Sequence, residues 1–306
     1  MTQLRVLIVA SEVPPLVSGI ARSVGDLAEG LRARGHIVDV LSAADERYAK
    51  RGDFRVSALG RRIPDLRRRL GNYDVINIHG PAPTISEVFL AGLARRRRRD
   101  NPAIVYTHHF TMEMPQRWLS PLVAIYNRVL LSLARGADAV VVTSESYAGL
   151  VAQAGVSRVS VIPWGIDPER HRRSVVAANG APPAGPQPAD DDLTDQAQTR
   201  PLRVLYVGQL RSYKGAHVAI DALRRLDGVT LKVIGTGPLA DMLQREAMAL
   251  PDSRVELLGF CDDDVVDMWY RWADVVVLPS TSRLEAFGIV LLEGMSAGCV
   301  PVSYTH

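Results

Sequence analysis

Two glutamates near the end of the chain, Glu285 and Glu293, are the residues whose type and spacing most directly suggest chemistry. They flank an apolar run that contains Gly288, and Gly298 is a helix stop, so a helix is predicted from about Phe287 to Ala297. On one helix, residues eight apart lie about 12 Å apart along the axis and about 80° apart around it. Glycosidase carboxylates lie closer, roughly 5–9.5 Å apart, so these two form a poor acid–base pair on one bond.

The spacing better fits two contacts on one long ligand. Amides near Gly288 would face the middle of that ligand, and a helix N-terminus suits a diphosphate there. Glu285 and Glu293 would each hold a sugar, which matches a nucleotide-sugar with its ribose, diphosphate and hexose. The alternative is an ordinary amphipathic helix with two solvated glutamates, and geometry alone leaves both interpretations open.

The segment GQLRSYKG places two cations, Arg211 and Lys214, in a turn between a strand and a helix predicted near 214–226. Such a turn brings positive charge and helix N-terminal amides to a phosphate group. A solvated turn is the alternative, and the order of strand, cations and helix favours phosphate binding.

The segment VIGTGPLA fits the pattern G-x-G-x-x-A after a strand, with Gly235 and Gly237 as its glycines. Glu256 closes the following strand near where a ribose-binding acid would lie, so a dehydrogenase is one interpretation. The pattern is short and lies in the second half of the chain. We therefore favour a tight turn, or a phosphate role without NAD, with Pro238 at the first helical position.

Two motifs could suggest a metal. Asp262–Asp264 look like the DxD of a metal-dependent sugar transferase, but acidic residues at a helix N-terminus explain them more simply. His108 and His109 end a strand, where adjacent residues face opposite sides and cannot easily bind one metal together. One of them can still face a ligand. No metal site is predicted.

The elements that must position these residues alternate between strand and helix. Apolar runs such as LRVLIVAS and VTLKVIG are typical of parallel strands buried on both faces. We predict an α/β fold of two doubly wound, Rossmann-like domains facing a cleft, because ligands bind at the carboxyl ends of such strands. The first domain covers residues 1–173, a Pro-, Ala- and Asp-rich linker or insertion 174–200, and the second domain 201–306.

Composition and charge exclude several classes of protein. The sequence is 47% hydrophobic with a formal net charge of +3, which fits two packed cores and gives no strong attraction to nucleic acid. Cys261 and Cys299 lack metal-ligand spacing and are expected to be buried thiols in a reducing cytoplasm. The sequence lacks a signal-peptide pattern and any apolar run of about 18 residues.

Arginine runs at 67–69 and 95–99 come at the ends of predicted helices. Solvated helix ends explain them, because cations suit the C-terminal dipole. The alternative is contact with an anionic membrane that presents a lipid-linked acceptor. The predicted location is cytoplasmic, with peripheral contact at the inner face of the membrane as the corresponding alternative.

Taken together, these segments resemble the glycosyltransferase 4 family of retaining, nucleotide-sugar-dependent enzymes with the GT-B fold. The segment EAFGIVLLE is similar to the family's E-x7-E element, its most specific motif. The segments SGIARSVGDLAEGLRARGHIVDVL, VIPWGID, VGQLRSYKG, GTGP and ADVVVLPSTSRLEAFG match in order and spacing. The resemblance covers nearly the whole chain outside 174–200.

The resemblance implies roles for matching residues of the second domain. Glu293 would bind the ribose hydroxyls and Glu285 would lie beside the donor hexose. Lys214 would hold the diphosphate together with the backbone amides of Phe287, Gly288 and Ile289. Neither a metal nor a cofactor is implied, because cations and helix amides would stabilise the departing nucleoside diphosphate.

The resemblance implies two roles in the first domain. Gly19 would approach the phosphate, and His109, which aligns better than His108, would contact the donor sugar near the reacting carbon. Two positions depart from the family: Gln209 stands where an arginine is common, with Arg211 as the candidate replacement, and the glycine loop is Ser18–Gly19 rather than two glycines.

The chain also ends sooner than family members usually do, at SYTH after the segment CVPV. We expect a C-terminal truncation, with an exposed sheet edge, a tendency to aggregate and weak or absent activity. The residues Tyr304, Thr305 and His306 are interpreted as read-through.

The function predicted from the sequence is transfer of a hexose from a nucleotide-sugar to an acceptor hydroxyl on a lipid-linked saccharide, a phospholipid headgroup or a small metabolite. Two alternatives belong to other classes: an epimerase of the same fold acting on a nucleotide-sugar, and a non-catalytic nucleotide-sugar binder. The dehydrogenase interpretation requires that NAD binds.

Overall fold

The computed structural model describes residues 2–14, 18–42, 70–94, 102–114, 117–167, 200–251, 254–282, 284–285 and 287–304. The chain divides into two compact units, Met1–Trp164 and Gly165–His306. The arginine runs at 67–69 and 95–99, and nearly all of segment 174–200, lie outside the described residues.

The first unit is a six-stranded parallel sheet with the strand order β2-β1-β3-β4-β5-β6. Its strands are β1 (Arg5–Ala10), β2 (Ile37–Ser42), β3 (Val75–Gly80), β4 (Ala103–His108), β5 (Ala139–Val142) and β6 (Val159–Val161). Its α-helices are α1 (Gly19–Ala33), α5 (Ser86–Ala94), α6 (Ser120–Ala134) and α7 (Glu145–Gln153), and the 3-10 helix η1 spans Arg117–Leu119. Ile8, Ile76 and Val140 are fully buried, as expected for apolar runs in a sheet that is covered on both faces.

The second unit is a five-stranded parallel sheet with the order β11-β10-β7-β8-β9. Its strands are β7 (Leu202–Val207), β8 (Val229–Ile234), β9 (Val255–Gly259), β10 (Val275–Leu278) and β11 (Val300–Ser303). Its helices are η2 (Ser212–Lys214), α9 (Ala216–Ala222), η3 (Leu223–Arg225), α10 (Ala240–Met248), α11 (Asp263–Trp272) and α12 (Ile289–Ser296). The helix predicted near 214–226 is thus a short α-helix between two 3-10 turns.

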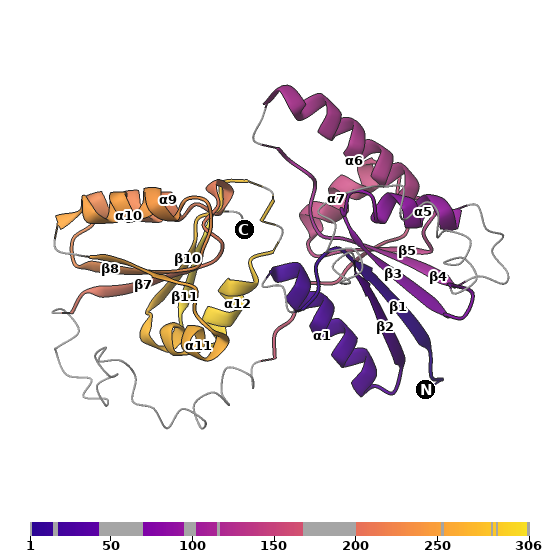
Figure 1. Cartoon of the computed structure of the whole chain (residues 1–306), viewed down its shortest axis with the longest axis horizontal. Helices are drawn as coiled ribbons and strands as arrows, with labels where there is room; N and C mark the ends of the chain where they lie inside the picture. Colours follow the sequence, from indigo (N-terminus) through magenta and orange to yellow (C-terminus); the bar gives the residue numbers. More distant parts are fainter. Residues whose placement is uncertain are drawn as a thin grey trace. The chain divides into compact units, whose positions relative to one another are not determined.

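Helices cover both faces of this second sheet (Figure 1). One core cluster joins α9 and α10 to the sheet through Ile220, Leu231 and Leu243, which are fully buried. A second cluster joins α11 and α12 to the other face through Tyr270 and Leu291. Both units are therefore doubly wound α/β layers, and the fold class predicted from the strand–helix alternation is confirmed.

The amino ends of the sheets carry a repeated aspartate clamp. Each clamp is formed by an aspartate that stands just before a strand. The aspartate carboxylate accepts a hydrogen bond from the backbone N–H of a residue in the neighbouring strand, and the aspartate backbone N–H donates to the carbonyl of the same residue. The pairs, with the carboxylate distances, are Asp74 with Arg5 (2.7 Å), Asp138 with Ile104 (2.9 Å) and Asp274 with Arg203 (2.9 Å). The same device therefore sets strand register in both units.

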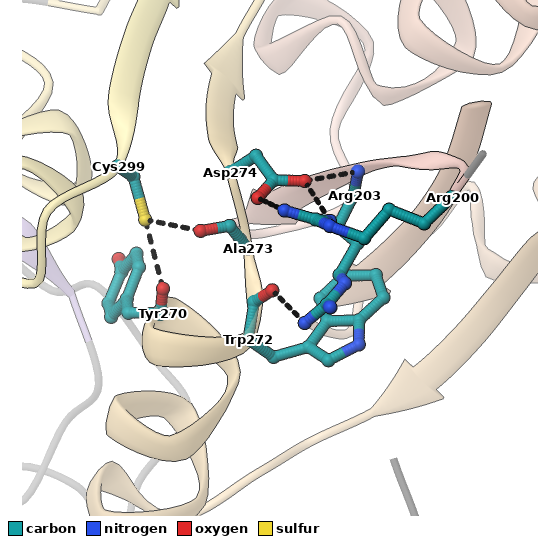
Figure 2. A network of polar contacts seen from close by, with 7 residues as sticks. All are labelled: Arg200, Arg203, Tyr270, Trp272, Ala273, Asp274 and Cys299. Carbon is teal, nitrogen blue, oxygen red and sulfur yellow. Dashed lines mark hydrogen bonds and ion pairs between the residues drawn. The ribbon is translucent and has the colours of Figure 1, made fainter. Parts of the chain in front are cut away.

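The Asp274 clamp is extended by side chains (Figure 2). Arg200 makes two hydrogen bonds to the Asp274 carboxylate, at 2.7 and 2.8 Å. The pKa of Asp274 is lowered, chiefly by the hydrogen bonds from Arg200 and then by the backbone N–H of Arg203. Cys299 is buried nearby with its thiol 2.9 Å from the Tyr270 carbonyl, whereas Cys261 is partly exposed, so the expectation of two buried thiols is wrong for Cys261.

Candidate functional site

Three loops meet at the carboxyl edge of the second sheet, because β10, β7 and β8 are neighbours and run parallel. The turn after β7 lies against the loop after β10 at Gly215, which has φ of 76°. A Cβ at Gly215 would lie 1.9 Å from the carbonyl oxygen of Pro279, so a side chain cannot be accommodated. The Thr281 N–H also donates to the Tyr213 carbonyl at 2.8 Å. The two loops are therefore fixed to each other.

An ion pair between Lys214 and Glu285 bridges these two loops. Lys214 Nζ donates to Glu285 Oε2, and the side chains are only 21% and 9% exposed. The Ser280 hydroxyl lies 3.4 Å from the same carboxylate oxygen. Burial, followed by the negative charge of Glu285, raises the pKa of the nearby Tyr206. A cation and an anion predicted as ligand contacts are thus held side by side in one partly buried spot.

Arg211 lies at the exposed rim of the same turn. Its Nε donates to the Gln209 side-chain oxygen at 2.9 Å, and the Gln209 carbonyl accepts from the Tyr206 hydroxyl at 3.2 Å. Gln209, the position where the resembling family commonly has an arginine, therefore orients the Arg211 guanidinium instead of supplying a charge itself.

The loop after β8 packs on the turn after β7. A Cβ at Gly235, which has φ of 141°, would lie 1.9 Å from the Gly208 carbonyl oxygen, and Gly237 approaches the Leu210 backbone in the same way. Close backbone approach therefore accounts for both glycines, as the interpretation of a tight turn expects. The helix α10 begins at Ala240, so the prediction that Pro238 occupies the first helical position is wrong.

Glu256, the acid required by the dehydrogenase interpretation, forms an ion pair with Lys232 on the adjacent strand β8. Lys232 Nζ also lies over the rings of Trp269 and Trp272, at 5.5 and 5.9 Å from their centres. The carboxylate is therefore engaged by a cation that two indole rings hold in place.

The second predicted glutamate, Glu293, is buried in α12 with 3% of its surface exposed. The Tyr270 hydroxyl of α11 donates to Glu293 Oε2 at 2.9 Å. Glu285 lies outside the helix, because α12 begins at Ile289, two residues later than predicted, with Gly288 as its N-cap. The estimate of the spacing between the two glutamates, which assumed that both are helical, therefore does not apply. The alternative of an amphipathic helix with two solvated glutamates is wrong.

The helix α12 presents its first turn at the same edge, where Phe287, Gly288 and Ile289 lead into it. A Cβ at Gly294 would lie 2.4 Å from Val276 Cγ1, so the helix lies close against β10. Unpaired N–H groups of a helix start attract anions. Glu285, Lys214 and this helix start therefore all belong to the loops around the end of β10.

The acidic run occupies the start of α11, as predicted, with Asp262 as the N-cap residue and Asp263 and Asp264 in the first turn. Within the described parts of the chain, no three His, Cys, Asp or Glu side chains gather as metal ligands.

In the first unit, His109 follows the end of β4 and is 3% exposed. Its Nε2 lies 2.8 Å from Nδ1 of His79, the last residue but one of β3, and its ring stacks on Trp164 with 5.2 Å between ring centres. Burial, followed by the neighbouring His79 and His108, lowers the pKa of His109. Burial also lowers the pKa of His79 to about 4. The imidazoles are therefore neutral at physiological pH.

His108 has a different set of neighbours from His109. Its Nδ1 lies 3.2 Å from the Tyr106 hydroxyl, and its ring meets Tyr147 edge-on at 5.8 Å. Burial lowers its pKa to about 4. The two adjacent histidines thus face separate surroundings, as the strand geometry predicts.

Gly19 is the first residue of α1 and follows the carboxyl end of β1. Ser18 caps the helix, since its hydroxyl accepts from the Ala21 N–H at 3.1 Å. Among the described residues, which omit 15–17 just before this turn, nothing lies within 4 Å of a Cβ built at Gly19.

Four side chains at these positions were not singled out from the sequence: His79, Trp164, Ser280 and Tyr270. His79 had a detectable signal, because it lies next to the end of a buried strand, much as His108 lies at the end of another. Trp164 lies in the segment VIPWGID, which was noticed only as a motif. Ser280 lies in the segment ADVVVLPSTSRLEAFG in the same way, whereas Tyr270 carries no sequence signal, since its role depends on a contact with Glu293 made by folding.

Within the described residues, no helix is both long and apolar enough to cross a lipid bilayer.

Comparisons with known proteins follow the same division. The model of Glycosyltransferase Family 4 matches residues 17–170, and the model of Glycosyl transferases group 1 matches residues 193–306. D-rhamnosyltransferase WbpZ of Pseudomonas aeruginosa is 31% identical over 229 residues, which is 74% of this chain and 53% of that protein. The match thus spans about half the length of that relative.

A second relative, O-antigen chain mannosyltransferase C of Escherichia coli, is 26% identical over 92% of this chain and 74% of its own length. Among solved structures, Anabaena Alr3699/HepE in complex with UDP has a TM-score of 0.67 at 20% identity, covering 98% of this chain and 80% of that one. The same protein has been solved with UDP-glucose. This likeness shows the fold, two Rossmann-like α/β units as in GT-B proteins.

Proposed function

Because the chain belongs to glycosyltransferase family 4, we propose that it moves a hexose from a nucleoside diphosphate sugar to an acceptor hydroxyl with retention of anomeric configuration. The observation that carries the proposal is the partly buried Lys214–Glu285 pair beside the start of α12. A diphosphate needs cations and amides, whereas a hexose needs a hydrogen-bond acceptor, and the two needs meet at this pair.

Donor binding follows from the charges of these loops. Lys214, the amides of Phe287, Gly288 and Ile289, and the rim guanidinium of Arg211 offer positive charge to the diphosphate. Glu293 binds the ribose hydroxyls, with Tyr270 fixing its carboxylate. Gly235 and Gly237 keep the neighbouring turn compact, and their backbone borders the nucleotide.

The reaction exchanges one bond at the anomeric carbon for another. The bond to the phosphate oxygen breaks, the nucleoside diphosphate leaves with the electron pair, and the acceptor oxygen forms the new bond as it loses its proton. Lys214 and the helix amides stabilise the negative charge that develops on the leaving group. In the first unit, the family resemblance gives His109 a role near the reacting carbon of the donor sugar and Gly19 a role near the phosphate.

The acceptor is a hydroxyl of a lipid-linked saccharide, a phospholipid headgroup or a small metabolite. The name of the O-antigen chain mannosyltransferase supports a saccharide among these. We propose a cytoplasmic enzyme that meets lipid-linked acceptors by peripheral contact with an anionic membrane.

Replacement of Glu285 by alanine tests the proposal against a matched control. Glu285→Ala is expected to abolish sugar transfer, because the carboxylate contacts the donor hexose. Glu256→Ala removes another lysine-paired glutamate of the same unit, 55% exposed, and is expected to leave transfer unchanged. The measurement is nucleoside diphosphate release together with labelled sugar appearing in an acceptor.

Equal turnover of wild type and Glu285→Ala would refute the role of this glutamate. Conversion of the nucleotide-sugar into an epimer without any acceptor would identify an epimerase. Binding without either product would identify a non-catalytic binder, and binding of NAD that is lost in Glu256→Ala would favour the dehydrogenase interpretation.

A further inference from the structure

The imidazoles of His79 and His109, near the ends of β3 and β4, are not only buried but also held by specific contacts. His79 Nδ1 and His109 Nε2 lie 2.8 Å apart, and the backbone N–H of His109 donates to the Gly80 carbonyl at 2.8 Å. The Trp164 ring stacks on the face of the His109 ring, with 8° between the planes. Backbone, ring face and ring nitrogen of His109 are thus all held by neighbours.

A hydrogen bond between two neutral imidazoles requires that one nitrogen carries the proton and the other accepts it. Two arrangements satisfy this. Either His79 Nδ1–H donates to His109 Nε2, or His109 Nε2–H donates to His79 Nδ1. The choice decides which nitrogen of His109 carries a proton.

The far nitrogen of His79 distinguishes the two arrangements. His79 Nε2 is buried and has no hydrogen-bond partner among the residues that the structure describes. If His109 donated, His79 would carry its proton on Nε2 and bury an unpaired N–H. Orphaned buried N–H groups are rarer than unpaired acceptors, so His79 Nδ1–H is the donor. His109 then carries its own proton on Nδ1.

We propose that His79 is a positioning residue that fixes His109 as the Nδ1–H tautomer and holds its ring in one orientation. His109 thereby presents a hydrogen-bond donor, suited to an oxygen atom of a sugar, at its Nδ1 edge. The consequence for sugar transfer rests on the proposed function, whereas the tautomer itself does not.

The tautomer is measured directly by ¹⁵N–¹H correlation spectra of histidine-labelled protein at mildly alkaline pH. His36 provides an internal reference, because its Nδ1 accepts from the Leu4 N–H at 3.3 Å and its proton must therefore be on Nε2. We expect His109, assigned by the signals lost in His109→Gln, to show the opposite pattern. His79→Leu is expected to remove that preference. An Nε2–H form of His109 in the wild type, or an unchanged tautomer in His79→Leu, would overturn the proposal.

Kinetics of three variants test the consequence. His79→Asn keeps a polar atom at the Nδ1 position, His79→Gln moves it to the Nε2 position, and His79→Leu has none. We expect kcat to fall about tenfold in the Leu and Gln variants, with KM for the donor changed much less, and to be largely restored in Asn.

Equal kcat in all three variants, each confirmed to unfold cooperatively, would contradict the positioning role. If the Leu variant does not fold, the comparison of Asn with Gln decides in the same way. If no transfer is detected in the wild type, the proposed function fails while the tautomer measurement still decides the role of His79.

Discussion

At the scale of single residues, the two members of the Lys214–Glu285 pair should affect the binding of a diphosphate in opposite ways. A diphosphate attracts Lys214 and repels Glu285, since the carboxylate and the phosphates carry the same sign. The ion pair with Glu285 holds the lysine side chain in one orientation in a partly buried place. Nucleotide binding and sugar transfer should therefore separate when the two residues are replaced one at a time.

We predict that Lys214→Met raises the Kd for the nucleoside diphosphate about tenfold or more, because hydrogen bonds to charged groups contribute about 1.5–3 kcal/mol. Glu285→Ala should bind the same nucleotide as tightly as the wild type or more tightly. Isothermal titration calorimetry measures both constants. Lys232→Met is the control, because Lys232 has the same type of glutamate partner, Glu256, on the strands β8 and β9. Unweakened binding by Lys214→Met would exclude it from the phosphate site.

At the scale of elements, the aspartate clamps show how short polar contacts fix the register of the strands. The apolar runs place these strands in the core but do not set their register. The Asp274 clamp joins the start of β10 to β7, and Arg200, which lies outside the sheet, also donates to the Asp274 carboxylate (Figure 2). The Arg200 side chain is 53% exposed, so water screens much of its attraction to the carboxylate. The bond to the backbone N–H of Arg203 is the more protected part.

For Asp274→Asn we predict a loss of at most about 1 kcal/mol in the free energy of unfolding near neutral pH, because the amide oxygen can still accept from Arg203. The pKa of Asp274 is lowered on folding from its ordinary value of 3.8, so its contribution is present above that value and is lost as pH falls through the folded pKa. Wild type and variant should therefore converge in acid. Chemical denaturation at a series of pH values measures this, and a difference that persists in acid would contradict it.

The elements also show what the sequence could and could not reveal. The apolar runs LRVLIVAS and VTLKVIG correctly predicted the strands β1 and β8, because burial in the middle of a sheet leaves a continuous apolar signal. The start of α12 was missed by two residues, since Gly288 adopts a left-handed conformation that only the folded loop requires. The partners of the site, Tyr270 for Glu293 and His79 for His109, come from distant elements, so spacing along the chain could not identify them.

At the scale of the whole molecule, each unit has its own sheet and its own core, and the division between the units falls after Trp164. The residues proposed to hold the nucleotide lie almost entirely in the second unit. A ligand that binds only the folded state stabilises the unit that binds it. Stability of the two units should therefore respond differently to the donor.

We predict that one of UDP, GDP and ADP raises the thermal unfolding temperature of the chain and that NAD does not. A ligand at 100 times its Kd stabilises the folded state by about 2.7 kcal/mol. If the units melt separately, only the transition of the second unit should move, which peptide-level hydrogen exchange can assign. A shift with NAD alone would support the dehydrogenase interpretation instead, and a shift confined to the first unit would place the nucleotide elsewhere.

The aspartate clamps lie at the amino ends of the strands, whereas every loop of the proposed site follows a carboxyl end. A clamped strand such as β10 therefore has its register fixed at the amino end and a loop of the proposed site at the carboxyl end. Loop sequences can drift or be randomised in a library without loosening the register of the sheets. Such a scaffold is suited to acquiring new sugar preferences quickly, because a change in selectivity need not be accompanied by a compensating change in the framework.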